Sequence, residues 1–128
     1  MQLDLIAKPQ GITRAEARRN AMQAAQARAQ LGQDRAAAAV EFDTPGWIES
    51  AVEALRAFAR SQGGVFSIEQ ARAVIGPTLP VPHELRVWGK VVVEAKKRGF
   101  IRSAPRTYIA TACSNGTAKP GWTRGDAA

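Results

Sequence analysis

Residues 83–98 read HELRVWGKVVVEAKKR and are followed by Gly99, a residue type that commonly ends helices. Placed at 100° per residue, this segment has two distinct faces. The apolar face consists of Leu85, Trp88, Val92 and Ala95, and the other face carries Arg86, Lys90, Glu94 and Lys97. We therefore expect a helix with one buried stripe and one exposed basic face.

Two shorter helices are expected on the N-terminal side of this segment. The first covers residues 44–62, because Thr44 and Pro45 suit its cap and first position and apolar residues then recur at spacings of three and four. The second covers residues 67–76 and begins with a capping box, Ser67-Ile68-Glu69-Gln70. A proline-rich segment then connects it rigidly to the basic helix.

Short β-prone runs follow Gly99, at residues 100–103, 107–110 and 121–123, and residues 114–117 carry a turn signal between them. The resulting order is three helices and then a β-hairpin. This α+β, mainly α, arrangement is typical of a winged helix-turn-helix domain. We place the domain at residues 43–124, with a C-terminal tail at residues 125–128.

The N-terminal third carries little apolar surface. Residues 1–12 are expected to form a tail, and residues 13–42 a helical arm that starts at a Thr13 capping box and is rich in Ala, Gln and Arg. Its large apolar residues are essentially Met22, Leu31 and Val40. The arm is therefore either solvent-exposed and partly frayed or becomes ordered on a partner. Whether it also dimerises the protein stays open.

Packing roles are expected for the tryptophans and for one glycine. Trp88 lies on the apolar stripe, and Trp47 and Trp122 fall at a helix start and on a terminal strand. All three are assigned to the core rather than to base stacking. Gly89 costs helix stability relative to alanine, so we expect it to permit a close helix contact.

The positive charge is concentrated in the last third of the chain. The net charge is +7, and residues 84–128 supply nine basic against three acidic side chains, hence +6 of it. In a winged-helix domain the third helix enters the major groove and the hairpin contacts phosphates. The predicted DNA-binding residues, on helix and hairpin, are Arg86, Lys90, Lys97, Arg102, Arg106 and Lys119.

Three segments resemble a group of small phage and prophage winged-helix proteins. They are LRVWGK at residues 85–90, KRGFI at residues 97–101 and SNGTAKPGW at residues 114–122. In that group an Arg-x-Trp-Gly helix leads through a Gly-aromatic/Leu-Ile strand to a Ser-Asn-x-x-x-Lys-Pro-x-Trp ending. The resemblance implies a DNA-binding protein without enzymatic activity, acting on double-stranded DNA in replication or in transcription regulation.

A second resemblance concerns the N-terminus. The pentapeptide Gln2-Leu3-Asp4-Leu5-Ile6 is similar to the peptide by which bacterial replication and repair proteins bind the β sliding clamp, with Ile6 where that pattern has Phe. Such a peptide buries two apolar side chains in a clamp pocket while the glutamine forms hydrogen bonds nearby. The resemblance implies the clamp, or another replication protein, as a partner.

Several functional classes do not fit the composition. One cysteine, Cys113, and one histidine, His83, cannot supply a Cys/His zinc site. Paired acidic residues and a phosphate-binding glycine loop are also missing, so we expect no enzyme, no metal and no cofactor. The longest apolar run, residues 36–40, is too short to cross a bilayer. We therefore expect no membrane partner and an intracellular protein. The resemblance to phage and prophage proteins implies the bacterial cytoplasm, in association with the nucleoid.

One alternative stays open. A winged helix also serves as a protein-interaction module, in which the third helix binds another protein. The basic face would then match an acidic partner surface, as in a replication adaptor, a helicase loader or an inhibitor.

Overall fold

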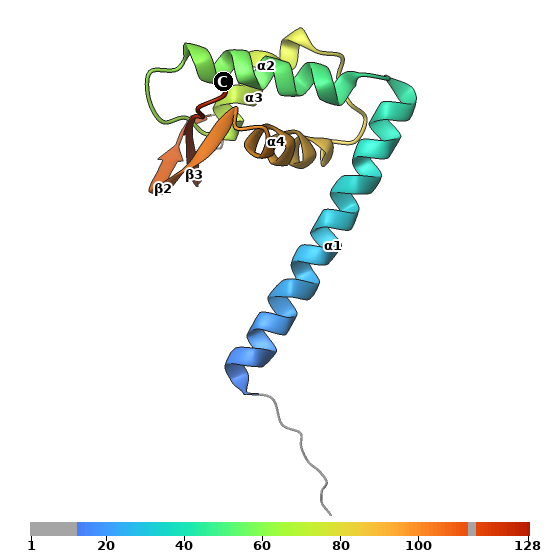
Figure 1. Cartoon of the computed structure of the whole chain (residues 1–128), viewed down its shortest axis with the longest axis vertical. Helices are drawn as coiled ribbons and strands as arrows, with labels where there is room; N and C mark the ends of the chain where they lie inside the picture. The colour runs from blue at the N-terminus through green and yellow to red at the C-terminus, as the bar shows by residue number, and fades with distance from the viewer. Residues whose placement is uncertain (1–12, 113–114) are drawn as a thin grey trace, which may run out of the picture. The chain divides into compact units, whose positions relative to one another are not determined.

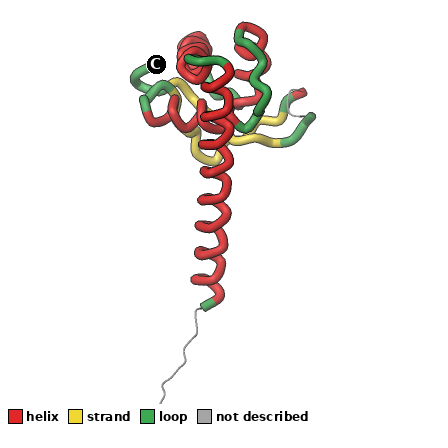
Figure 2. Tube along the Cα trace, turned by 90° about the vertical axis from the view of Figure 1, so that its right-hand side faces the viewer, coloured by secondary structure: helices red, strands yellow, loops and turns green. Residues whose placement is uncertain are grey.

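The computed structural model of the chain describes residues 13–112 and 115–128, and its elements, apart from one short 3-10 turn, are labelled in Figure 1. They are α1 (Arg14–Asp43), α2 (Trp47–Ser61), α3 (Ile68–Ile75), a short 3-10 turn η1 (Gly76–Thr78), α4 (Val87–Lys97), β2 (Ile101–Ala110) and β3 (Ala118–Arg124). The two strands form one antiparallel hairpin, drawn in yellow among red helices in Figure 2. The predicted α+β, mainly helical class is confirmed.

The first part of α1 belongs to a separate unit that ends at Gly32. Every side chain from residue 13 to residue 31 is exposed, as expected for a helical arm with few apolar residues. The predicted N-terminal cap is present, because the Glu16 amide donates to Thr13 Oγ1 at 3.1 Å.

The last turns of α1 belong to the second, compact unit, which comprises residues 33–128. Ala36, Ala37 and Val40 are buried in its core. The compact unit therefore begins ten residues before the boundary that we placed at residue 43. Periodicity did not reveal this segment, because its buried positions are mostly alanines, which carry little apolar signal in a sequence.

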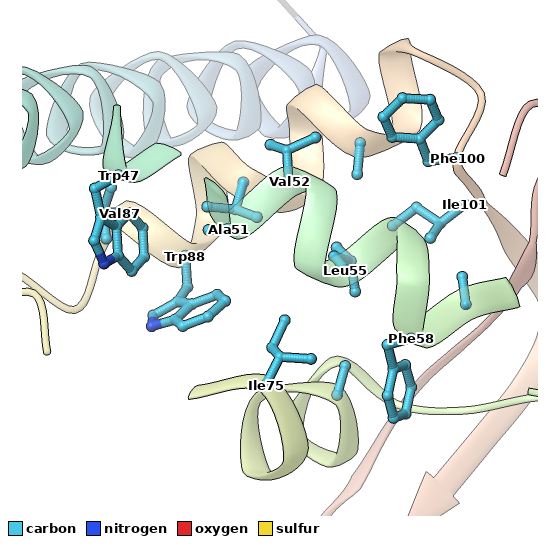
Figure 3. Packing of buried hydrophobic residues seen from close by; sticks show 14 of the residues in the cluster. Trp47, Ala51, Val52, Leu55, Phe58, Ile75, Val87, Trp88, Phe100 and Ile101 are labelled. Carbon is cyan, nitrogen blue, oxygen red and sulfur yellow. The ribbon is translucent and has the colours of Figure 1, made fainter. Parts of the chain in front are cut away.

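The core is built around α2. Val52, Leu55 and Phe58 of α2 belong to one buried cluster with Ile75 of α3 and with residues of α4 and β2. In Figure 3, Phe58 lies on the same side of α2 as Ile75, and Val52 lies on the opposite side. At the N-terminal end of α2, the Trp47 and Trp88 rings meet edge to face with centroids 5.3 Å apart. Both tryptophans are buried, which confirms their assignment to the core; Trp122 is half-buried and packs against the same cluster.

Two helix starts differ from the predicted ones. The N-cap of α2 is Gly46, with φ at 85° and no side-chain cap, instead of Thr44. The cap is supplied by Glu41 of α1, whose carboxylate accepts from the amides of Gly46 (3.3 Å) and Ile48 (3.2 Å). A carboxylate at a helix N-terminus also interacts favourably with the helix dipole.

The basic helix begins at Val87 instead of His83. The three preceding residues form a turn in which each carbonyl accepts from the amide three positions on, as between Glu84 and Val87 at 3.2 Å. This tighter turn changes the angular position of the residues before the helix. Leu85 is consequently 60% exposed, and its predicted place in the core was wrong. The face that is buried consists of Val87, Trp88, Val91 and Ala95.

The hairpin contains one long, irregular strand where two short runs were predicted. Pairing starts with Ile101 opposite Arg124, but residues 105–107 of β2 have no partner on β3. Arg106 lies in this bulge and has a positive φ of 58°. Proline cannot donate to a ladder, so Pro105 suits such a position. On the N-terminal side, Phe66 pairs with Trp122 of β3 through two backbone hydrogen bonds.

An ion pair ties the C-terminal end of α4 to α2. Arg98 Nη1 lies 2.6 Å from Glu49 Oε2, and Arg98 Nη2 lies 3.0 Å from Glu49 Oε1. The hydrogen bonds from Arg98, aided by its charge, lower the pKa of the Glu49 carboxyl from its usual 4.5, and desolvation opposes this only in part.

The Glu49→Gln variant should therefore show a stability loss that depends on pH. Because the folded-state pKa is the lower one, the stabilisation is fully present above pH 4.5 and is lost as the pH falls through the folded-state value. We expect the Tm of Glu49→Gln to lie below that of the unaltered protein at pH 7 and the gap between the two values to be smaller at pH 3. Thermal melts at both pH values test this, and a constant gap would contradict it.

Candidate nucleic-acid interface

The predicted cations at the start of α4 both have acidic partners. Arg86, the N-cap residue, lies 3.1 Å from Glu84 of the preceding turn. Its hydrogen bonds and charge lower the pKa of Glu84. Lys90 lies 3.3 Å from Asp34 of α1, and its side chain is only 34% exposed. These pairs reduce the net charge that the first half of α4 presents.

The last turns of α1 cover part of this same region. Gly89 lies directly beside the Gln33 side chain, and a Cβ at this position would clash with the Gln33 amide. The predicted close helix contact at Gly89 is therefore present. Gln33 lies over Gly89 and Asp34 pairs with Lys90, so this part of the predicted recognition face is packed against α1 within the compact unit.

The second half of α4 is more open. Lys96 and Lys97 are exposed, and neither has an acidic partner in the described part of the chain. Lys96 lies over the Trp122 ring, with Nζ 5.9 Å from the centroid, so it connects α4 to the hairpin. Sequence reasoning had counted Lys96 in the basic excess without assigning it to the site.

The hairpin carries the remaining predicted cations. Arg106 is exposed on the bulge of β2, and Lys119 lies on β3 opposite Ile109. Neither forms an ion pair with any acidic residue that the structure describes. Arg102 lies nearer the base of the hairpin, where its Nη1 is 3.8 Å from the Asp126 carboxylate.

The six predicted DNA-binding residues therefore fall into two groups. Arg86 and Lys90 lie at the start of α4 with acidic partners, whereas Lys97 and the three hairpin cations lie toward its C-terminal end and on β2 and β3. Two arginines that prediction did not assign to the site, Arg60 and Arg124, line a surface hollow together with Arg102. The charge excess of this region was the signal that could have included Arg124.

A second hollow, of about 450 Å³, has a different character. It lies between α3, η1 and the start of α4 and is lined partly by Val81, Pro82, Leu85 and Trp88. Val81 is 88% exposed and Leu85 60% exposed. Exposed apolar groups that gather in one place are typical of protein-binding surfaces.

The clamp-like pentapeptide, Gln2-Leu3-Asp4-Leu5-Ile6, lies outside the described residues, as does Cys113. In residues 13–112 and 115–128, acidic, His and Cys side chains form no cluster that could hold a metal ion. Over the same residues, none of the helices is both long enough and apolar enough to cross a bilayer.

Comparisons of the chain with protein-family models, with curated proteins and with solved structures found no match. The phage winged-helix resemblance therefore stays a prediction from the quoted sequence segments.

Proposed function

We propose that this protein is a non-enzymatic DNA-binding protein of the winged helix-turn-helix type, which holds duplex DNA through its hairpin and the C-terminal half of α4. The order of elements in the compact unit supports this proposal. After α2 come the Phe66 bridge, α3, α4 and the hairpin. Counted from α2, this order matches α4 to the third helix of a winged helix-turn-helix domain and β2–β3 to its wing.

The observation that carries the proposal is the set of cations left without acidic partners. Lys96, Lys97, Arg106 and Lys119 are grouped on neighbouring elements, and none is neutralised by a described carboxylate. Cations without an acidic partner favour binding to DNA, because they replace counterions that the phosphate backbone releases. Phosphate contacts position a protein on DNA without specifying a sequence. A role in phage-type replication or in transcription regulation rests on the sequence resemblance.

We expect salt-sensitive binding of a fluorescently labelled random-sequence duplex, measured by anisotropy. With about four phosphate contacts, the affinity should fall roughly 10²-fold between 50 and 200 mM salt. A single-stranded oligonucleotide of the same sequence serves as the comparison. No binding at the lower salt concentration would contradict the proposal.

A second candidate function is a protein-interaction module. The apolar hollow lined by Val81 and Leu85 favours it, because DNA offers little apolar surface to such a site and a protein offers much. Arg86, adjacent to this hollow, would then face an acidic residue of the partner. Failure of the duplex titration would leave this candidate as the better one.

A further inference from the structure

Three arginines from different elements line one hollow at the base of the hairpin. Arg60 comes from α2, Arg102 from β2 and Arg124 from β3. The hollow has a volume of about 470 Å³, and Gly125, Asp126 and Ala128 complete its lining. Its side chains are thus three guanidinium groups and one carboxylate, with small residues between them.

The carboxylate only partly neutralises the three arginines. Asp126 lies 3.8 Å from Arg102, and its side chain is 97% exposed. Arg124 Nη1 donates to the backbone carbonyl of Arg60 at 3.4 Å, which orients its guanidinium without cancelling its charge. Arg60 has no acidic partner among the residues that the structure describes. The hollow therefore retains an excess of positive charge.

The segment that carries Asp126 is fixed against the turn after α4. The Gly125 amide donates to Phe100 O at 2.9 Å, and the Ala127 amide donates to Gly99 O at the same distance. Gly125 packs directly on the Gly99 carbonyl, and a Cβ there would clash with backbone that cannot move aside. The backbone on both sides of Asp126 is thus held in place, which keeps its carboxylate within reach of Arg102.

We propose that this hollow binds a phosphate group and that Asp126 competes with the phosphate for Arg102, one of the three arginines. Guanidinium groups bind phosphate through paired hydrogen bonds, and a phosphate brings more acceptor oxygens than one carboxylate. On the proposed function, the phosphate belongs to the DNA backbone. Only that choice of source rests on the proposed function, since free phosphate tests the hollow by itself.

The first test uses inorganic phosphate on the full chain, titrated by calorimetry at constant ionic strength. Arg60→Gln should weaken phosphate binding about tenfold, because it removes a charge-assisted hydrogen bond. Asp126→Asn should strengthen it about two- to fivefold, the range expected for losing an exposed competing ion pair. Arg35→Gln is the matched control, since Arg35 is an exposed arginine of the compact unit that does not line the hollow.

Opposite shifts for Arg60→Gln and Asp126→Asn, with Arg35→Gln unchanged, support the proposal. If Arg60→Gln binds phosphate as tightly as the unaltered protein, or if Arg35→Gln weakens it equally, the site is overturned. If Asp126→Asn shows no gain, the competition is overturned. Thermal melts show that each variant is folded. Arg60→Lys keeps the charge but loses the paired hydrogen bonds, so its phosphate affinity should lie between that of Arg60→Gln and that of the unaltered protein.

The second test repeats the set with labelled duplex DNA. If each variant changes its affinity for DNA in the same direction as its affinity for phosphate, the phosphate that the hollow binds belongs to the DNA backbone. Shifts for phosphate alone indicate a free phosphate compound and remove the hollow from the DNA interface. If the unaltered protein binds phosphate but no DNA, the proposed function fails while the phosphate site stands.

Discussion

Trp47→Ala is expected to destabilise the compact unit by about 3–5 kcal/mol, a large part of the stability of a domain this size. Trp47 is 2% exposed, and its ring packs edge to face on Trp88. Its Nε1 donates to the Pro80 carbonyl at 2.7 Å, which fastens the connection between η1 and α4 to the start of α2. Removal of the ring leaves a cavity and an unpaired carbonyl at once.

Urea unfolding followed by circular dichroism at 222 nm measures this loss without depending on tryptophan fluorescence. Trp47→Phe keeps an aromatic ring but not the donor, so its loss should be smaller than that of Trp47→Ala. Val93→Ala, at a 42% exposed position of α4, should change the stability by less than about 0.5 kcal/mol. A loss below about 1 kcal/mol for Trp47→Ala would show that the contact between the Trp47 and Trp88 rings contributes little to the stability of the core.

The sequence predicted those parts of the fold whose causes are local. The α3 cap is an example, because Ser67 and Gln70 exchange hydrogen bonds of 3.1 and 2.9 Å within one turn. The start of α2 depends on Glu41 of another helix, which local pattern rules do not consider. The bulge of β2 likewise follows from pairing with β3, and its proline was the only local indication.

The candidate site shows the same division. Composition located the basic excess correctly in the last third of the chain, because charge can be counted. It could not show which cations are neutralised. Asp34 lies 56 positions from Lys90, and only the packing of α1 against α4 brings them together. The Arg60, Arg102 and Arg124 cluster also joins α2 to the hairpin, although α3 and α4 lie between them in the sequence.

Because some cations have acidic partners and others do not, we expect two double variants that remove the same formal charge to weaken DNA binding unequally. The double variant Arg106→Gln with Lys119→Gln removes two cations that have no described acidic partner. It should lower duplex affinity roughly ten- to hundredfold at low salt and reduce the salt slope by about 2. The double variant Arg86→Gln with Lys90→Gln removes the same formal charge, but each of its cations already pairs with a carboxylate. Its loss should stay below about threefold.

Anisotropy titrations of both variants at several salt concentrations compare the two halves of the basic surface directly. The side chains of Arg86 and Lys90 are at least one third exposed, and Arg106 and Lys119 lie on the hairpin surface. Thermal melts should therefore show little change in stability for either variant. A larger loss for Arg86→Gln with Lys90→Gln would place the DNA at the start of α4. In that case DNA would have to displace Asp34 from Lys90, and Asp34→Asn should then increase the affinity for the duplex. If Asp34→Asn has no effect and the hairpin variant is the weaker binder, the phosphates are bound by the hairpin.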